Sequence, residues 1–370
     1  MQICYFISKD TVHKKDKENI VSSKKITVRE IANYAEVSAR TVSRYLNKNG
    51  YVGKDARFRI QKTIEMTGYY PNAMARNLRT KKTTSIGTVF YHSDYFAGFR
   101  RNFHRLLLSG LIESLGSDGY GIQILESCPE AKTKTKGTYY LDKIKSSSID
   151  GLILTDSLLP EQEIIEIQKY DIPFVVVNRF LENLPHRCIL GDDFAKGYKL
   201  AKFLFNRGHK IAYFGLPESF VEGEYTIKGI LKAANECQGQ FDTKDTIKND
   251  KNVIEQMIKI LEQKDGPTAV VCGTDEFTYW LAELLQCGVR VPPNFEYAGE
   301  IHDNSVLPAQ QPVYVSEPIG WKLGFEAGNL LLSIINSSKE NSQPTYVKIN
   351  EYRQITNSKA ELLKKLRETF

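Results

Sequence analysis

The side chains best suited to chemistry in this sequence are hydrogen-bond donors gathered on one short segment near the N-terminus. Arg40 and Arg44 stand four residues apart, with Thr41 and Ser43 between them. Residues four apart share one face of a helix, so both guanidinium groups are expected to point the same way. A guanidinium can bond guanine O6 and N7 in bidentate fashion, and hydroxyl groups suit phosphate oxygens. The segment favours a surface that reads nucleic acid, and the alternative is an ordinary helical hairpin with exposed arginines.

Motifs for catalysis, cofactors and metals are missing from the sequence. It contains no glycine-rich dinucleotide pattern after the first expected strand, no P-loop, no G-x-S-x-G elbow and no H-E-x-x-H. The six histidines form no evident ligand set, and we expect His209 to be structural. No two of the six cysteines have C-x-x-C spacing, so we expect free thiols. We therefore expect no catalytic residue, no metal and no cofactor, and nothing positive supports an enzyme.

Charge is distributed unevenly along the 370 residues. Residues 1–85 hold 18 basic and 7 acidic side chains, a net +11, whereas the remainder holds 32 basic and 37 acidic, a net −5. A localised basic segment favours a polyanionic partner. Residues 1–25 show no helical or strand period and are predicted to be a flexible basic extension. No apolar run is long enough to span a bilayer, and no signal peptide is evident, so we expect a cytoplasmic protein without membrane contact.

Short helices must hold the arginine segment in place. Thr27 and Glu30 have the spacing of a capping box, and Ser38 can cap the helix that carries the arginines. Two helices joined by a three- or four-residue turn form a helix-turn-helix, whose second helix enters the major groove of DNA. We expect an all-α head over residues 26–70. Its predicted helices cover residues 28–35, 39–47 and 54–67.

Two motifs in this region carry a family resemblance. VSARTVSRYLN, at residues 37–47, and GYYPNAMARNLRT, at residues 68–80, resemble the head and hinge of the lactose/galactose repressor family in order and spacing. The resemblance implies that Ala39, Arg40 and Arg44 read bases and that Asn47 lies near the DNA backbone. Gly53 stands where the family usually has a helix-capping Ser, which leaves a phosphate contact there open but does not affect the fold.

Residues 71–82 are predicted to be a hinge. A helix of two turns here is too short to be stable alone, so we expect it to form only against its symmetry mate and DNA. Ala75 belongs to its small apolar face, and Arg79 adds a cation. The resemblance implies that the hinge lies in the minor groove with Leu78 wedged between base pairs, which exchanges unstacking energy for a bent duplex.

Strand and helix patterns alternate through residues 83–370. Such alternation predicts parallel sheets covered on both faces, with ligands at the carboxyl ends of the strands. The predicted strands are 86–91, 121–125, 151–155, 173–177, 210–215, 269–272 and 297–299, and the predicted helices are 102–116, 137–145, 160–170, 198–207, 225–236, 253–263 and 277–287.

Segments of this region, among them IPFVVVNR and NRGHKIAYFG, resemble the two-lobed core that the same family shares with periplasmic binding proteins. The resemblance implies an α/β, doubly wound core that binds and senses a small-molecule effector between its lobes and mediates dimerisation. It also implies three crossovers between the lobes, near residues 181–187, 310–314 and 336–344.

Candidate effector-binding residues lie at strand ends and in one loop. The resemblance places Arg179 and Asp275 in the pocket, where an arginine suits sugar hydroxyls or a carboxylate and an aspartate suits sugar hydroxyls. Asp303 is a third candidate. Tyr91 and Phe96, in the long loop at 91–101, can stack on a sugar face.

Two departures from the family pattern leave the ligand unnamed. Residues 91–94 replace the usual aspartate-proline segment, and Glu224 falls roughly where many members have a pocket arginine. We include Glu224 among the effector-binding candidates.

The sequence therefore predicts a homodimeric transcription regulator, a repressor, that binds double-stranded operator DNA and a sugar-like effector. Two alternatives stay open: a cytosolic ligand-binding protein whose head does not read DNA, and an activator of the same architecture. Leu362, Leu363 and Leu366 have helical spacing over too short a segment for an independent coiled coil, so we expect a dimer and not a tail-assembled tetramer.

Overall fold

The computed structural model describes residues 26–47, 49–70, 82–90, 102–127, 139–155, 161–247, 252–301, 313–336, 344–348 and 352–354. The chain divides between residues 81 and 82 into two compact units, a small N-terminal head and a larger body. The predicted extension at 1–25, and the hinge residues Ala75, Leu78 and Arg79, lie outside the described residues. Within the described part, no helix combines the length and the apolar character needed to cross a membrane.

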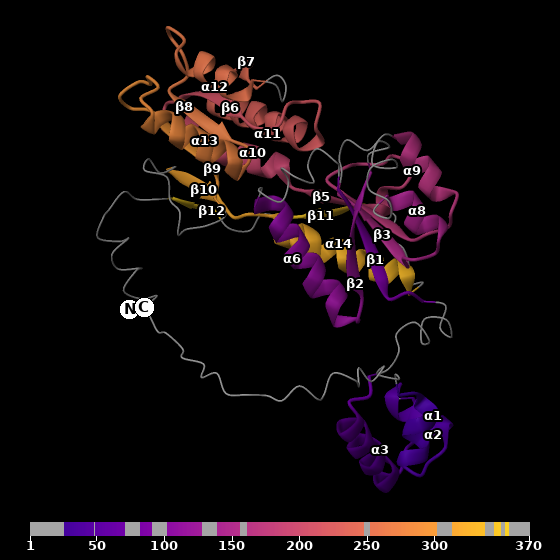
Figure 1. Cartoon of the computed structure of the whole chain (residues 1–370). Coiled ribbons are helices and arrows are strands. Elements are labelled where there is room, and N and C mark those ends of the chain that lie inside the picture. The colour runs from indigo at the N-terminus through magenta and orange to yellow at the C-terminus, as the bar shows by residue number, and fades with distance from the viewer. Residues whose placement is uncertain are drawn as a thin grey trace, which may run out of the picture. The chain divides into compact units, whose positions relative to one another are not determined.

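The head contains the three helices that the sequence predicts (Figure 1). The Thr27 backbone N–H donates to Glu30 Oε2 at 2.7 Å, and the Glu30 N–H donates to Thr27 Oγ1 at 3.3 Å, which confirms the capping box. The Thr41 N–H donates to Ser38 Oγ at 3.1 Å, which confirms the second cap. Gly53 precedes the third helix without a side-chain capping bond. The helices are α1 (Val28–Tyr34), α2 (Ala39–Leu46) and α3 (Lys54–Thr67).

One small apolar core holds these three helices together. Ile31 of α1, Val42 of α2 and Ile60 of α3 are completely buried against one another. Helices this short have little stability alone, so burial of these side chains fixes α2 in place. The core therefore determines which face of α2 stays outside.

The body contains two six-stranded sheets, one in each lobe (Figure 1). The first sheet is parallel throughout, in the order β11-β5-β4-β3-β1-β2. Its strands are β1 (Ser85–Phe90), β2 (Gly121–Glu126), β3 (Gly151–Leu154), β4 (Phe174–Val177), β5 (Cys188–Gly191) and β11 (Thr345–Val347), and its helices are α6 (Asn102–Ser117), α8 (Tyr140–Lys145), α9 (Glu161–Gln168) and α14 (Gly320–Ile335), with a short 3-10 turn, η1 (Pro185–Arg187), before β5.

The second sheet has the order β12-β10-β9-β8-β6-β7, in which only the β10–β12 pair is antiparallel. Its strands are β6 (Lys210–Phe214), β7 (Gln240–Thr246), β8 (Ala269–Cys272), β9 (Glu296–Glu300), β10 (Tyr314–Ser316) and β12 (Tyr352–Gln354), and its helices are α10 (Asp193–Phe205), α11 (Val221–Cys237), α12 (Val253–Leu261) and α13 (Asp275–Gln286).

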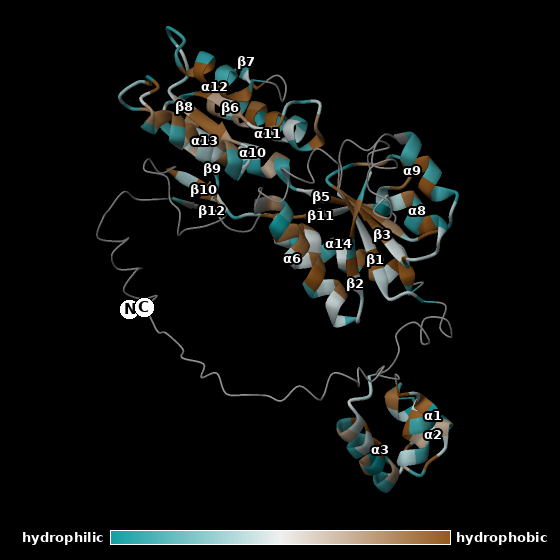
Figure 2. Ribbon diagram, in the orientation of Figure 1, coloured by the Kyte–Doolittle hydropathy of each residue, from teal (hydrophilic) through white to brown (hydrophobic). Residues whose placement is uncertain are grey.

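Alternate side chains of each central strand enter different cores. Along β4, Val175 and Val177 pack toward α6 and α14, whereas Phe174 and Val176 pack toward α8 and α9. The strands of the second lobe divide in the same way between α10 with α11 and α12 with α13. A strand covered on both faces is apolar at every position, and the central strands are accordingly hydrophobic along their length (Figure 2). The predicted parallel sheets covered on both faces are confirmed.

The three crossovers between the lobes lie later in the chain than predicted. β5 belongs to the first sheet and α10 to the second lobe, so the first crossing is near residue 192 and not at 181–187. The second connects β10 to α14 at 317–319, and the third connects β11 to β12 at 348–351. The prediction was wrong because β5, β10 and β11 are only three or four residues long and were not recognised as strands.

His209 is structural, as expected. Its Nε2 lies 3.0 Å from Glu296 Oε2 and its Nδ1 lies 3.2 Å from Thr268 Oγ1. Arg207 also bonds Glu296, with Nε 2.6 Å from Oε2. These contacts connect the start of β6 with Thr268, which precedes β8, and with Glu296, the first residue of β9.

Two helix pairs approach each other so closely that only glycine fits at the contact. A Cβ atom on Gly324 of α14 would lie 2.0 Å from the backbone oxygen of Leu107 in α6, and one on Gly110 of α6 would lie 2.1 Å from that of Trp321. In the second lobe, Gly229 of α11 would meet the backbone oxygen of Phe194 in α10 at 2.2 Å. Because backbone cannot yield as a flexible side chain does, these glycines set the helix spacing.

We expect Gly324→Ala to destabilise the first lobe by about 1–3 kcal/mol or more, since the added methyl group must push the two helices apart. Gly116→Ala is the matched control, because Gly116 is exposed on α6 and a Cβ there meets nothing within 4 Å. The control should be neutral or stabilising by up to about 1 kcal/mol. Urea unfolding of both variants measures the difference, and equal stabilities would show that the helices can separate without cost.

Candidate functional site

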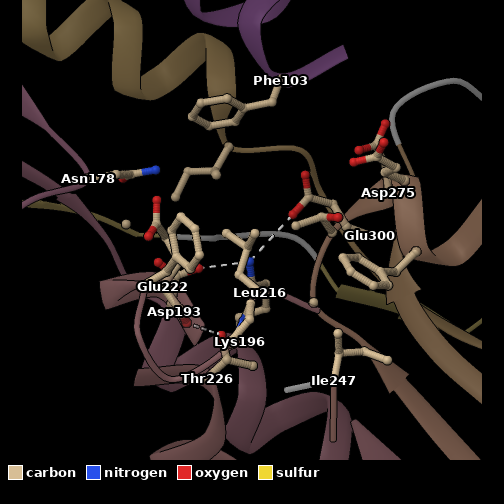
Figure 3. A pocket seen from close by; sticks show the side chains of 18 of the residues that line it. Phe103, Asn178, Asp193, Lys196, Leu216, Glu222, Thr226, Ile247, Asp275 and Glu300 are labelled. Atoms are coloured by element: carbon tan, nitrogen blue, oxygen red, sulfur yellow. Dashed lines mark hydrogen bonds and ion pairs between the residues drawn. The ribbon is translucent and has the colours of Figure 1, made fainter. Parts of the chain in front are cut away.

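A cavity of about 260 Å³ lies where the carboxyl ends of the strands of the two lobes meet. One buried water needs only about 10–15 Å³, so the space suits a small molecule better than a structural water. Its walls come from both lobes: Phe103 and Ile319 from the first, and the starts of α10, α11 and α13 from the second. The polar side chains that line it include Asn178, Asp193, Lys196, Glu222, Thr226, Asp275 and Glu300 (Figure 3).

A buried lysine lies at the centre of this wall. Lys196 Nζ lies 2.8 Å from Asp193 Oδ1 and 3.6 Å from Glu300 Oε2, and all three side chains are less than one tenth exposed. Burial alone lowers the pKa of Lys196, but Asp193 and Glu300 outweigh that effect and hold it above its usual value. Lys196 therefore stays charged and is already engaged by carboxylates of its own lobe.

Asn178 and Glu222 reach the cavity from different lobes (Figure 3). Asn178 follows β4 directly and has a left-handed backbone with φ of 56°, which asparagine tolerates better than most residues. Its N–H donates to the Ile189 oxygen at 2.8 Å, which fixes its backbone. Glu222 lies in the first turn of α11. Both the Asn178 Oδ1 and the Glu222 Oε2 atoms are buried and have no hydrogen-bond partner.

Two carboxyl groups of the cavity bind protons unusually well. Burial raises the pKa of Glu222 to about 7, and the nearby Asp193 carboxylate adds to this. Burial also raises the pKa of Glu300 to about 7, against the opposing effect of Lys196. Because burial disfavours their charged forms, these two carboxyl groups lower the free energy of unfolding at neutral pH. Groups with strongly shifted pKa values are common at functional sites.

Aromatic side chains complete the cavity. Phe103, Phe220, Phe277 and Trp280 line it, and the Phe277 and Trp280 rings contact edge to face with centroids 5.2 Å apart. The Tyr213 hydroxyl is seated between two glycines at strand ends, where a Cβ on Gly215 or Gly273 would lie 2.2 or 2.5 Å away. Flat apolar walls beside buried carboxylates suit a ligand with both a ring and polar groups.

The structure brings only some of the predicted effector residues to the cavity. Asp275, buried at the start of α13, lines it. Arg179 is half-buried and is not among the described lining residues. Glu224 lies on the outer side of α11, ion-paired with Lys228, and the cavity is instead lined by Glu222, two residues earlier. The other three candidates, Tyr91, Phe96 and Asp303, lie outside the described residues.

Four cavity residues that the sequence did not indicate lie at the ends of helices or strands. Asp193, Lys196 and Glu222 lie in the first turns of α10 and α11, whereas the predicted helices began at 198 and 225. Glu300 ends β9, one residue past the predicted strand. One signal for these residues is present in the sequence. Asp193 and Lys196 stand three residues apart after an apolar run, a spacing at which opposite charges pair on one face of a helix. In the described part of the chain, no group of acidic, histidine or cysteine side chains is arranged to hold a metal ion.

The second candidate surface is the exposed face of α2 on the head. Ala39, Arg40, Arg44 and Asn47 are exposed, while Thr41 and Ser43 are half-buried. Thr41 Oγ1 lies 2.9 Å from Ser38 Oγ, and the Asn47 side chain donates to the Ser43 oxygen at 2.5 Å. The two arginines therefore carry the outward-facing charge of this helix, as the spacing predicts.

Two family matches cover most of the described elements. Residues 27–72 match the family described as "Bacterial regulatory proteins, lacI family". Residues 91–294 match "Periplasmic binding proteins and sugar binding domain of LacI family".

Curated relatives match over nearly their whole length. Catabolite control protein A of Priestia megaterium is 27% identical over 90% of this chain and 99% of that protein. The transcriptional repressor PurR of Photorhabdus laumondii is 28% identical over 86% of this chain and 92% of its own length. CytR of Escherichia coli, also a transcriptional repressor, is 25% identical over 83% and 89%.

Solved structures have the same fold. The lac repressor dimer bound to operator and the anti-inducer ONPF matches with a TM-score of 0.69 and 19% identity, over 90% of this chain and 99% of that one. The regulator CelR in complex with cellobiose matches with a TM-score of 0.59 and 21% identity, over 90% and 98%. The predicted combination of a helical head and a two-lobed α/β core is confirmed.

The raised carboxyl pKa values give a prediction for stability against pH. Glu222 and Glu300 bind protons in the folded protein up to about pH 7, whereas unfolded glutamates release them near pH 4.5. The folded state thus binds more protons between these values, and the free energy of unfolding should fall as pH rises through this window. Glu222→Gln should make the fall shallower, and Glu224→Gln should leave it unchanged. Urea unfolding from pH 5 to pH 8 measures the slopes, and identical slopes for all three proteins would contradict the assignment to Glu222.

Proposed function

The chain belongs to the LacI family of bacterial regulatory proteins, and on that premise we propose that it is a dimeric, effector-controlled repressor that reads operator DNA with α2. It is a transcription regulator and not an enzyme, as the sequence predicts, and as a bacterial DNA-binding regulator it acts in the cytoplasm. The observation that carries the proposal is the pairing of an exposed, doubly basic α2 with a polar cavity between two lobes.

Base reading is assigned to the outward face of α2. Arg40 and Arg44 can each bond a guanine in the major groove, and Ala39 is small enough to allow close approach. Thr41, Ser43 and Asn47 lie beside them and suit phosphate oxygens. Ala75, Leu78 and Arg79 remain proposed minor-groove residues. A dimer presents two such helices, so its operator should be a pseudo-palindrome.

Effector binding is assigned to the cleft cavity. Its residues come from both lobes, so a ligand there contacts both and can change their separation. Asp275, Glu222 and Asn178 supply acceptors for ligand hydroxyl or amino groups, and the aromatic walls can cover a ring. Such coupling is reciprocal, so operator must change effector affinity by the same factor by which effector changes operator affinity.

Two alternatives, an activator of the same architecture and a ligand-binding protein whose head does not read DNA, are less well supported. Relatives named as repressors favour repression over activation. A ligand-binding protein whose head does not read DNA would not need two arginines exposed on the second helix of a helix-turn-helix. Deletion of residues 1–82 separates this alternative, because a regulatory effect that survived the deletion would exclude DNA reading by the head.

The full chain should sediment as a dimer and bind DNA from upstream of its own gene saturably and with sequence preference. Analytical ultracentrifugation and a gel-shift titration against scrambled DNA measure these properties. The DNA competition should be done at fixed salt, because phosphate contacts make affinity strongly salt-dependent. A monomer, or equal affinity for scrambled DNA, would contradict the proposal.

Arg44→Ala should weaken operator binding by about 1–3 kcal/mol and relax the base preference at one position of each half-site. Lys62→Ala is the control, since Lys62 is an exposed basic side chain on α3 and its loss should not alter base preference. Gel shifts against a set of single-base operator variants measure both. If Arg44→Ala reduced affinity equally for every sequence, Arg44 would be a phosphate contact.

A further inference from the structure

The body begins with two residues whose backbone is held by one carboxylate. Asp150 Oδ1 accepts a hydrogen bond from the Thr83 N–H at 2.7 Å, and Asp150 Oδ2 accepts one from the Thr84 N–H at 2.8 Å. Thr83 directly follows residues 71–82, where the sequence predicts the hinge. Hydrogen bonds to a charged acceptor are stronger than those between neutral groups. Asp150 therefore fixes the backbone at the point where the chain enters the first lobe.

Thr84 has a backbone conformation that threonine disfavours. Its φ is 53°, in the left-handed region, where a β-branched residue is an outlier. Such strain persists only where surrounding contacts hold it, and it is concentrated at ligand clamps and switch regions. Two printed contacts hold Thr84: its N–H bonds Asp150, and its oxygen accepts from the Gly121 N–H at 2.9 Å. These bonds come from the starts of β3 and β2, the two strands that flank β1.

Asp150 is itself held in place before β3. Its N–H donates to the Ser85 oxygen at 2.8 Å, and the buried Ile149 precedes it. The Gln123 side chain of β2 donates to Ser85 Oγ at 2.8 Å and to the Ser148 oxygen at 3.3 Å, so it joins the start of β1 to the loop before β3. The carboxylate therefore acts from a rigid base, as a side chain must if it is to fix another segment.

The left-handed residue sets the direction in which the chain enters β1. The strand is extended from Ser85 to Phe90, and a single left-handed residue before it turns the backbone away from the line of the strand. Without an acceptor for its N–H, Thr84 would relax toward the extended or right-handed regions, which threonine prefers. The direction in which residues 71–82 leave the lobe would then vary from molecule to molecule.

We propose that Asp150 is a positioning residue for operator binding: it holds Thr84 in the left-handed conformation and so gives the hinge one fixed starting point on each subunit. This inference rests on the proposed function, in which the hinges of a dimer meet one operator. A hinge whose start varied would lose that freedom on binding DNA, and ordering the backbone of one residue corresponds to about a factor of ten in affinity. Asp150 removes this cost before DNA is bound, without touching DNA itself.

The test measures DNA affinity and unfolding separately in the full chain, with the DNA fragment from upstream of its own gene as the probe. Asp150→Asn keeps the size of the side chain but replaces one acceptor oxygen by an amide donor, which cannot accept a backbone N–H. We expect it to weaken binding about tenfold or more under conditions where urea unfolding shows the protein to be folded. Asp142→Asn is the matched control, since Asp142 is an exposed carboxylate on α8 of the same lobe, and it should bind like the wild type.

Thr84→Gly tests whether the conformation of residue 84 is what Asp150 controls. Glycine enters the left-handed region without strain, so it depends less on the carboxylate to hold it there. Combined with Asp150→Asn, it should restore part of the lost affinity, so that the effects of the two changes are not additive. Asp150→Glu keeps the charge but displaces both oxygens by one methylene, and it provides the same comparison if Asp150→Asn does not fold.

Two outcomes overturn the proposal. If the Asp150 variant unfolds at lower urea concentration but binds the fragment as the wild type does, Asp150 serves the stability of the lobe alone. If Thr84→Gly restores none of the lost affinity, Asp150 does not act through the conformation of residue 84. The wild-type titration separates the two levels of inference: no sequence preference in the wild type contradicts the proposed function, whereas wild-type binding that is unchanged by loss of the carboxylate contradicts only the role of Asp150.

Discussion

The arrangement of the cleft depends on one buried lysine, Lys196, and its two carboxylate partners. Lys196 cannot be buried with its charge unless carboxylates compensate for lost hydration, and Asp193 and Glu300 do so from the start of α10 and the end of β9. Asp193 and Lys196 both belong to the start of α10, directly after the first crossover, so the contact of Lys196 with Glu300 connects this start to the end of β9. Removing one partner of such a pair typically costs about 3–5 kcal/mol.

Close helix packing supplies the rigidity that the cleft needs. The glycine contacts between α6 and α14, and between α10 and α11, leave almost no freedom in the spacing of these helices. Phe103 of α6 and Glu222 of α11 each lie in the first turns of such a helix, so both side chains are held at the cavity by backbone contact and not by flexible loops. A ligand that engages both lobes consequently moves whole lobes.

Sequence patterns predicted the fold well and the site only in part. Capping at Thr27 and Ser38, and apolar runs such as that at Phe174 to Val177, are local signals, so the head helices and central strands were correct. Asp193, Lys196 and Glu222 were missed because helix starts are blurred in sequence: polar first turns resemble loops until their burial is known. Sequence position alone does not say which face of α11 meets the cleft, so it indicates Glu224 where the structure has Glu222 at the cavity. Asn178 lines the cavity, but in the sequence its neighbour Arg179 is the more conspicuous candidate because it is charged. The short strands β5, β10 and β11 carried too few residues to show a period, which displaced the predicted crossovers.

The order of the elements along the chain has a consequence for synthesis of the protein. The first lobe contains α14 and β11, which come from near the C-terminal end, and α14 covers the same face of the sheet as α6. The lobe that begins first on the ribosome is therefore completed only after most of the second lobe has emerged, and β12 then adds the last strand of the second lobe. Until then the apolar side of α6, with Leu107, Leu111 and Leu115, has no partner helix. A chain that ended prematurely after β10 would lose the covering of its first lobe and keep most of its second, so its nascent state would offer chaperones a long-lived hydrophobic surface.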